Sequence, residues 1–153
     1  MGADALKLMA IWRVDAPARP VLDLIDAFVA LAHGAGSIAV VEGIVRGRDG
    51  VSRDAFLTAT AAMARSADLY KAQPPIAGGT DDASVTALAR DVSDALDCPW
   101  VVLSTGVPEE RFPGVVAAAC RGGASGFLAG RAIWGAAVGA ADPATVLAGR
   151  SLE

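Results

Sequence analysis

Histidine and cysteine are scarce in this chain of 153 residues, which has one histidine and two cysteines. These residues often serve as general bases, nucleophiles and zinc ligands. Cys98 and Cys120 show no metal-binding spacing, and we interpret both as small core residues of a protein from a reducing compartment. A catalytic thiol is disfavoured because no histidine lies nearby in the sequence. His33 falls in the last turn of a predicted helix, where a partial positive charge is favourable.

The chain also lacks an excess of positive charge and an uninterrupted apolar run. Its net charge is −4 and its arginines are scattered, which argues against general nucleic-acid binding. The longest apolar-looking tract, residues 122–141, is rich in glycine and broken by Arg131, so it does not resemble a membrane span. Asp4 and Lys7 interrupt the only early apolar run, so no signal peptide is predicted. We therefore expect a cytoplasmic protein with no nucleic-acid or membrane partner.

Apolar residues, in contrast, are abundant. Hydrophobic residues make up 54% of the chain and charged residues 20%, which favours a sheet covered on both faces by alanine-rich helices. A chain of this length has room for one hydrophobic core, so residues 1–153 are predicted to form a single domain.

Apolar strand patterns alternate with helical ones along the whole chain. Strands are predicted to begin near residues 5, 37, 67, 99 and 126. Helices are predicted over 21–35, 52–66, 81–96 and 109–121, with a short apolar helix or turn over 132–139 and a last helix starting at Asp142-Pro143. The step of about thirty residues is the length of one right-handed βα unit.

Two architectures suit this repeat: a five-stranded open sheet, or four to five units of a (βα)8 barrel. A complete barrel needs about 250 residues, so this chain alone does not close one. Because the chain begins almost inside a strand, the second architecture is favoured.

Polar residues stand inside or just after these apolar strands, at Lys7, Glu42, Lys71, Ser104 and Arg131. The carboxyl ends of parallel strands face one rim, so the last four of these residues are expected to converge there. Lys71 lies just before Pro74-Pro75, which end its strand. A lysine in a half-apolar wall has its ammonium form disfavoured and can act as an amine nucleophile, so we predict a Schiff-base lysine.

Glu42, beside such an amine, is predicted to shuttle protons, and Lys7 to raise the local positive potential or to hold a charged group of the substrate. Two structural alternatives remain open. Lys71 could extend its ammonium to solvent, or it could form a buried ion pair with Glu42 that has no catalytic role.

The loops after the last two strands suggest a phosphate site. Ser104-Thr105-Gly106 and Gly130-Arg131 offer backbone amides, a hydroxyl and a guanidinium fork for a phosphate or sulfonate. The alternative for the glycines is simple turn geometry.

Three segments carry a resemblance to a known family: LYKA followed by proline (69–74), PWVVLSTGV (99–107) and GGASGFLAGRAIW (122–134). They resemble the class I tagatose 1,6-bisphosphate aldolases and their sulfofructose-phosphate aldolase relatives. Residues 5–9 and 40–42 resemble the family's fourth and fifth barrel strands. The resemblance therefore implies an α/β fold whose parallel βα units form about strands four to eight of a TIM (β/α)8 barrel.

The resemblance implies a class I aldolase, a lyase of carbohydrate metabolism that cleaves a ketose phosphate to dihydroxyacetone phosphate and an aldehyde. Tagatose 1,6-bisphosphate and 6-deoxy-6-sulfofructose 1-phosphate are the expected substrates. Lys71 matches the Schiff-base lysine, Glu42 the acid/base carboxylate and Lys7 the lysine of the fourth strand. The terminal phosphate or sulfonate is expected at Ser104, Gly106, Gly130 and Arg131. Gln73 departs from the family pattern, which has glutamate there.

No metal or other cofactor is expected, because the iminium replaces a Lewis acid. The competing prediction is a non-catalytic half-barrel fragment that self-associates and retains only anion binding. Exposed sheet edges predict a homo-oligomer under either interpretation.

Overall fold

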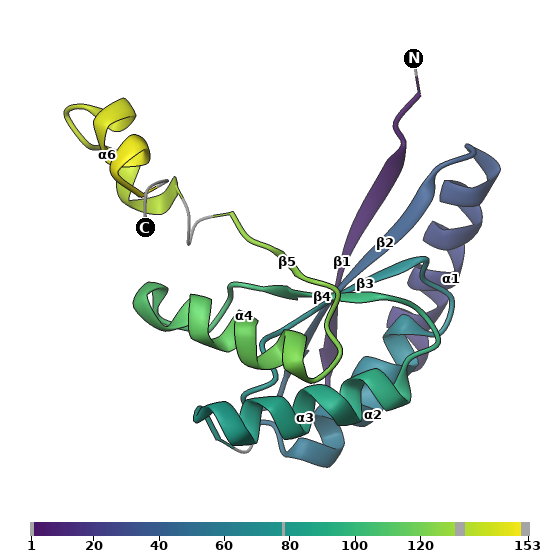
Figure 1. Cartoon of the computed structure of the whole chain (residues 1–153). Coiled ribbons are helices and arrows are strands. Elements are labelled where there is room, and N and C mark those ends of the chain that lie inside the picture. The colour runs from purple at the N-terminus through teal and green to yellow at the C-terminus, as the bar shows by residue number, and fades with distance from the viewer. Residues whose placement is uncertain (1, 78, 131–133, 151–153) are drawn as a thin grey trace.

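The computed structural model of the protein describes residues 2–77, 79–130 and 134–150. Strands and helices alternate along the chain, as Figure 1 shows. The strands are β1 (Ala5–Arg13), β2 (Ile38–Arg46), β3 (Leu69–Ala72), β4 (Trp100–Leu103) and β5 (Phe127–Leu128). The helices are α1 (Arg19–Gly34), α2 (Arg53–Ala64), α3 (Asp82–Ala95), α4 (Phe112–Arg121) and α6 (Pro143–Arg150), with 3-10 turns η1 (Glu109–Arg111) and η2 (Gly135–Ala137). The predicted alternation is confirmed, and every strand begins within two residues of its predicted start.

The five strands form one parallel sheet in the order β1-β2-β3-β4-β5. Each strand pairs with its sequence neighbour, because each helix returns the chain to the next position in the sheet. The predicted α/β class with parallel βα units is therefore confirmed.

Local sequence signals fix where several helices begin. The Ser52 hydroxyl accepts a hydrogen bond from the amide of Ala55 at the start of α2, and the Asp81 carboxylate does the same for Ser84 at the start of α3. Helix α4 starts only at Phe112, with Pro113 in its first turn, so the helix predicted from residue 109 begins instead as the 3-10 turn η1.

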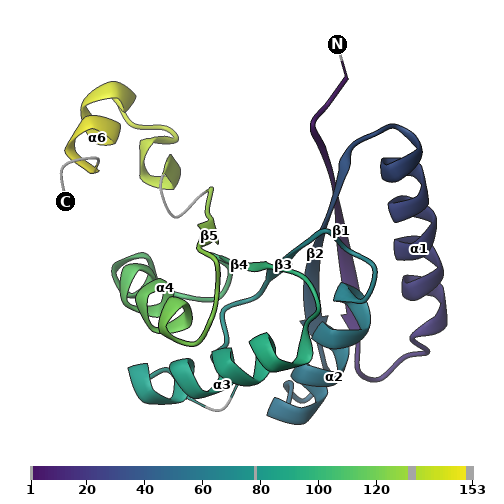
Figure 2. The same cartoon turned by 45° about the vertical axis from the view of Figure 1, so that its right-hand side comes forward.

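Helices α1 to α4 lie in an arc on one side of the sheet (Figure 2). We call the side they cover the covered face; its core includes the buried Ala10, Val41, Tyr70 and Val102. The opposite side is the open face, which carries Lys7, Met9, Ile11, Ile38, Glu42 and Lys71. The expectation that helices cover both faces is thus wrong. Along β1, exposed residues alternate with partly buried ones and the buried Ala10, as expected where helices pack against only one side of the strand.

The last strand ends this layered part of the molecule. Phe127 of β5 packs edge-on against Phe112 of α4, with ring centroids 5.9 Å apart. Helix α6 stands apart from the arc of helices, as Figure 2 shows.

The interpretation of both cysteines as core residues holds only in part. Cys98 is half-buried before β4, but Cys120 is exposed on α4 because it falls on the solvent side of that helix. Over the stretches that the structure describes, none of the helices combines the length and hydropathy that a membrane crossing requires.

Candidate active site

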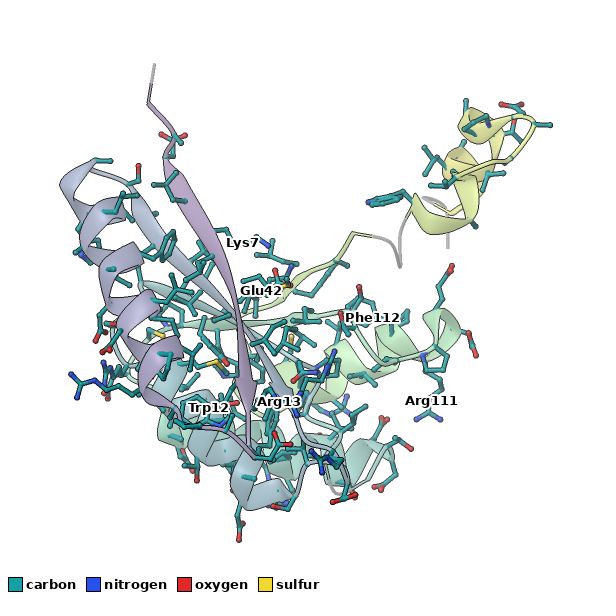
Figure 3. The ribbon with its side chains drawn as sticks, turned by 180° about the vertical axis from the view of Figure 1, so that it is seen from behind. Lys7, Trp12, Arg13, Glu42, Arg111 and Phe112 are labelled. Carbon is teal, nitrogen blue, oxygen red and sulfur yellow. The ribbon has the colours of Figure 1, made fainter. Side chains whose placement is uncertain are left out.

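Two lysines meet one carboxylate on the open face. Glu42 Oε2 accepts a hydrogen bond from Lys7 Nζ at 2.8 Å and another from Lys71 Nζ at 3.1 Å. Strand register explains the second contact, because Glu42 and Lys71 are direct partners across β2 and β3. Lys7 pairs in register with Val40, two residues before Glu42, and its long side chain covers that offset. Figure 3 shows Lys7 and Glu42 side by side.

The three side chains differ in their exposure to water. Only 11% of the Glu42 side chain and 17% of the Lys71 side chain are exposed, against 49% for Lys7. Burial of the Glu42 carboxyl raises its pKa, but the hydrogen bonds and charges of Lys7 and Lys71 outweigh burial and leave the pKa below its usual value. Glu42 is therefore a carboxylate at neutral pH and can accept a proton.

The geometry leaves one carboxylate oxygen available. Both lysines bond to Oε2, and none of the residues in the described stretches donates a hydrogen bond to Oε1. A hydroxyl group that donates a hydrogen bond to Oε1 would therefore displace neither lysine. The site can transfer a proton between the Lys71 amine, Glu42 and such a hydroxyl.

Lysine usage is a signal that the sequence interpretation overlooked. The chain has 13 lysines and arginines, of which Lys7 and Lys71 are the only lysines. Arginine makes charge pairs as well as lysine does, but it stays protonated and is a poor amine nucleophile. A chain that uses arginine at its other eleven cationic positions, yet places both lysines on one buried carboxylate, favours amine chemistry there.

The predicted phosphate-binding residues that the structure describes lie in the loops after strands β4 and β5. Ser104 and Gly106 follow the end of β4, and Gly130 follows β5. None of these three contacts the Glu42 carboxylate in the described part of the chain. Arg131 lies outside the described residues. The structure therefore brings together Lys7, Glu42 and Lys71, while the predicted anion site remains a prediction.

Two further contacts support the site and were not predicted from the sequence. The side-chain oxygen of Gln73 accepts a hydrogen bond from the Val45 amide at 2.6 Å, where β3 has ended and β2 still continues. On the covered face, Tyr70 packs over Gly43, and a Cβ atom at Gly43 would meet the Tyr70 hydroxyl oxygen at 1.8 Å. Both contacts join β2 to β3 beside the Glu42–Lys71 pair.

No cluster of three histidine, cysteine, aspartate or glutamate side chains placed to hold a metal ion occurs among the residues that the structure describes. The groups gathered at the open face are two amines and one carboxylate, which suit proton transfer and carbonyl chemistry.

Comparison with known proteins places this chain in a family. The model of the DeoC/LacD family aldolases matches residues 1–136. Among solved structures, the chain is 25% identical to a fructose-bisphosphate aldolase from Slackia heliotrinireducens over 85% of its own length and 42% of that protein's, with a TM-score of 0.68.

Two other structures share the fold at lower identity. One is a Schiff-base-forming fructose-1,6-bisphosphate aldolase, 18% identical over 99% of this chain and 58% of the other, with a TM-score of 0.69. The second is an archaeal fructose-1,6-bisphosphate aldolase whose catalytic lysine carries a carbinolamine; it is 17% identical over 86% and 51% of the two chains, with a TM-score of 0.64. The chain thus spans about half the length of the proteins it matches.

Proposed function

The chain belongs to the DeoC/LacD aldolase family, and on that basis we propose that it supplies the Schiff-base half of a class I aldolase. In this proposal residues 1–153 form one domain equivalent to about strands four to eight of a TIM barrel. The observation that carries the proposal is the contact of both lysines of the chain with the Glu42 carboxylate. The Schiff-base aldolases with the same fold support it.

Lys71 is the proposed nucleophile. Its ammonium first gives a proton to Glu42, 3.1 Å away, and the free amine then attacks the ketone carbon of a ketose phosphate. Glu42 returns the proton to the carbinolamine hydroxyl, which leaves as water and yields the iminium. Lys7 stabilises the ionised state of Glu42 before and after this transfer, and so favours return of the proton to the substrate.

Carbon-carbon cleavage follows from the iminium. A base removes the proton of the C4 hydroxyl, and the C3–C4 bond breaks to release an aldehyde. The electron pair of the broken bond forms the enamine on Lys71. Protonation at C3 and hydrolysis then release dihydroxyacetone phosphate. Glu42 is the proposed base, because its Oε1 accepts no hydrogen bond from the described residues.

Tagatose 1,6-bisphosphate and 6-deoxy-6-sulfofructose 1-phosphate are the proposed substrates. Both carry oxyanions, and Ser104, Gly106, Gly130 and Arg131 are the proposed contacts for a terminal phosphate or sulfonate.

Borohydride trapping tests the proposal directly. The chain is incubated with dihydroxyacetone phosphate and sodium borohydride, and the adduct is located by peptide mass spectrometry. We expect the adduct on Lys71, its loss in Lys71→Met, and a slower rate of labelling in Glu42→Gln. The chain has only one other lysine, so an adduct on Lys7 instead of Lys71 would contradict the proposed nucleophile.

A second candidate is a non-catalytic half-barrel that self-associates and binds only anions. The exposure of apolar residues on the open face favours it, since Met9 is 53% exposed and Ile11 52%. In this case a homo-oligomer buries the open face, and no adduct forms on Lys71. Trapping and sedimentation velocity together separate the two candidates, because the first predicts an adduct and the second predicts association alone.

A further inference from the structure

A second group of residues with hydrogen-bond donors lines a pocket of about 210 Å³ where β2, β3 and β4 end. Its polar lining comes from Arg46, Gln73, Thr105 and Gly106, and its walls are apolar side chains that include Phe56. Lys7, Glu42 and Lys71 do not line it. A hollow with apolar walls and a few convergent polar groups is typical of small-molecule sites.

The guanidinium of Arg46 has no acidic partner in the part of the chain that the structure describes. Its only hydrogen bond within the described residues goes to the carbonyl of the preceding Val45, at 3.3 Å, and no carboxylate there lies within ion-pair distance. Arg46 is exposed, so a ligand can reach it from solvent.

Gln73 adds an oriented amide to the same pocket. Because the Val45 amide must donate, the group that it contacts at 2.6 Å is the Gln73 oxygen, which leaves Nε2 with two free N–H groups. No acceptor among the described residues takes a hydrogen bond from this nitrogen.

The loop after β4 completes the set of donors. The Thr105 hydroxyl and the Gly106 amide make no hydrogen bond with any other residue that the structure describes. Gly106 has φ +83°, a conformation that favours glycine and sets the direction of its peptide group. The residues that line the pocket include no aspartate or glutamate.

We propose that this pocket binds the oxyanion of a small ligand of the phosphate or sulfonate class. Four groups can donate hydrogen bonds, one of them is charged, and no lining residue repels an anion. A neighbouring pocket is lined by Arg111, whose guanidinium donates to the Thr80 carbonyl at 2.7 Å, a shorter bond than the 3.3 Å from Arg46 to the Val45 carbonyl. The pocket shares Gly106 with the proposed contacts for the substrate's terminal oxyanion, but the proposal does not rest on Schiff-base chemistry at Lys71.

The substitution Gln73→Glu tests the charge of the pocket without removing its hydrogen bond to Val45. Glutamate has nearly the same shape and keeps an oxygen for the Val45 amide, but it loses the free N–H groups and places a negative charge beside Arg46. Arg46→Gln removes the positive charge instead. Arg48→Gln is the matched control, since Arg48 lies in the turn just after β2, two residues beyond Arg46, but does not line the pocket.

Inorganic phosphate is the probe, titrated at constant ionic strength while 1H–15N NMR spectra follow the Gly106 amide and the Gln73 side-chain amide. We expect saturable shifts of both signals in the wild type and in Arg48→Gln. The dissociation constant for phosphate should rise about tenfold or more in Arg46→Gln and in Gln73→Glu. In Gln73→Glu, which has no side-chain amide at this position, the Gly106 amide alone reports the binding. Equal affinity in all four proteins, or no saturable shift in the wild type, would overturn the proposal. The spectra themselves report whether each variant is folded.

Dihydroxyacetone phosphate, added to the phosphate-saturated protein, identifies the source of the oxyanion. Displacement of inorganic phosphate from the Gly106 signal supports a site for the substrate's own phosphate, whereas simultaneous binding supports a separate anion site. The Lys71→Met variant distinguishes this proposal from the proposed function. It should retain the phosphate shifts while it loses the borohydride adduct, and loss of the phosphate shifts in this folded variant would contradict an independent pocket.

Discussion

The open and covered faces of the sheet are built from the same strands, yet their side chains serve different needs. On the covered face, residues such as Tyr70 and Trp100 are almost completely buried beneath α1 to α4. On the open face, Met9 and Ile11 are half exposed beside the Lys7–Glu42–Lys71 cluster. The comparison indicates that stability comes mainly from the covered face, while the open face holds groups suited to chemistry or association. It follows that substitutions on the two faces should separate stability from function.

The largest expected difference between the faces is in stability. Trp100 is 2% exposed and its indole nitrogen donates to Ser93 Oγ at 3.0 Å, so Trp100→Ala should cost about 3–5 kcal/mol in the free energy of unfolding. Ile11→Ala, on the open face, should cost about 1 kcal/mol or less because Ile11 is half exposed. Urea denaturation at low protein concentration, followed by circular dichroism, measures both changes in the free energy of unfolding. Equal costs would show that the open face is packed in solution.

The sequence predicts those features of the two faces that depend on local patterns, but not those that depend on the register between strands. Apolar runs and helix caps such as Ser52 are local, and they located the strands and helices well. The pairing of Glu42 with Lys71 followed from two adjacent parallel strands. The offset of Lys7, in contrast, depends on the register between β1 and β2, which no local pattern encodes.

Other features were missed because they depend on contacts between distant segments. Only one face is covered because helices α1 to α4 all pack on the same side of the sheet. Amino-acid composition does not indicate on which side a helix packs. The bond from Val45 to the Gln73 side chain forms only because β3 ends before β2 does. The scarcity of lysine is evident in the sequence, but its link to the site depends on the contact of both lysines with Glu42 across the sheet.

A smaller stability effect is expected at Gly43, where the covered face has no room for a side chain. A Cβ atom there would lie 1.8 Å from the Tyr70 hydroxyl oxygen and 2.8 Å from the terminal carbon of Met63. Gly43→Ala should therefore cost about 1–3 kcal/mol through overpacking. Gly34→Ala is the control, because a Cβ there meets nothing within 4 Å.

Chemical denaturation of Gly43→Ala, alone and combined with Tyr70→Phe, measures this strain. Removing the hydroxyl should recover part of the loss, since the nearest clash disappears. If the double variant is as unstable as the sum of the two single variants, the Tyr70 hydroxyl is not the source of the strain.

Self-association is the next test of the open face. If a second copy covers this face, a charge at Ile11 becomes buried in the contact, so Ile11→Glu should weaken association about tenfold or more. Leu31→Glu is the matched control, because Leu31 is 63% exposed on α1, away from the open face. Sedimentation velocity over a concentration series gives both dissociation constants. An equal effect of the two substitutions would contradict association through the open face.

The smallest expected effect concerns the charges of the open face. Lys7→Met removes one of the two lysines that keep the pKa of Glu42 below its usual value, so that pKa should rise in the variant. A carboxyl group whose pKa is lowered by folding stabilises the protein above its unfolded-state pKa, and this contribution is lost as pH falls through the folded-state value. Because Lys7 is half exposed, the wild type should exceed Lys7→Met by only about 0.2–1 kcal/mol at pH 7.

Denaturation across a pH series, with 13C NMR of the Glu42 carboxyl carbon, tests this directly. The stability difference between wild type and Lys7→Met should vanish as pH falls through the folded-state pKa of Glu42, because a protonated carboxyl no longer pairs with Lys7. In a Glu42→Gln background, Lys7→Met should cost little at any pH, which isolates the pair as a double-mutant cycle. A stability difference that is independent of pH would mean that Lys7 acts through packing of its methylene chain, and the open face would then contribute to stability much as the covered face does.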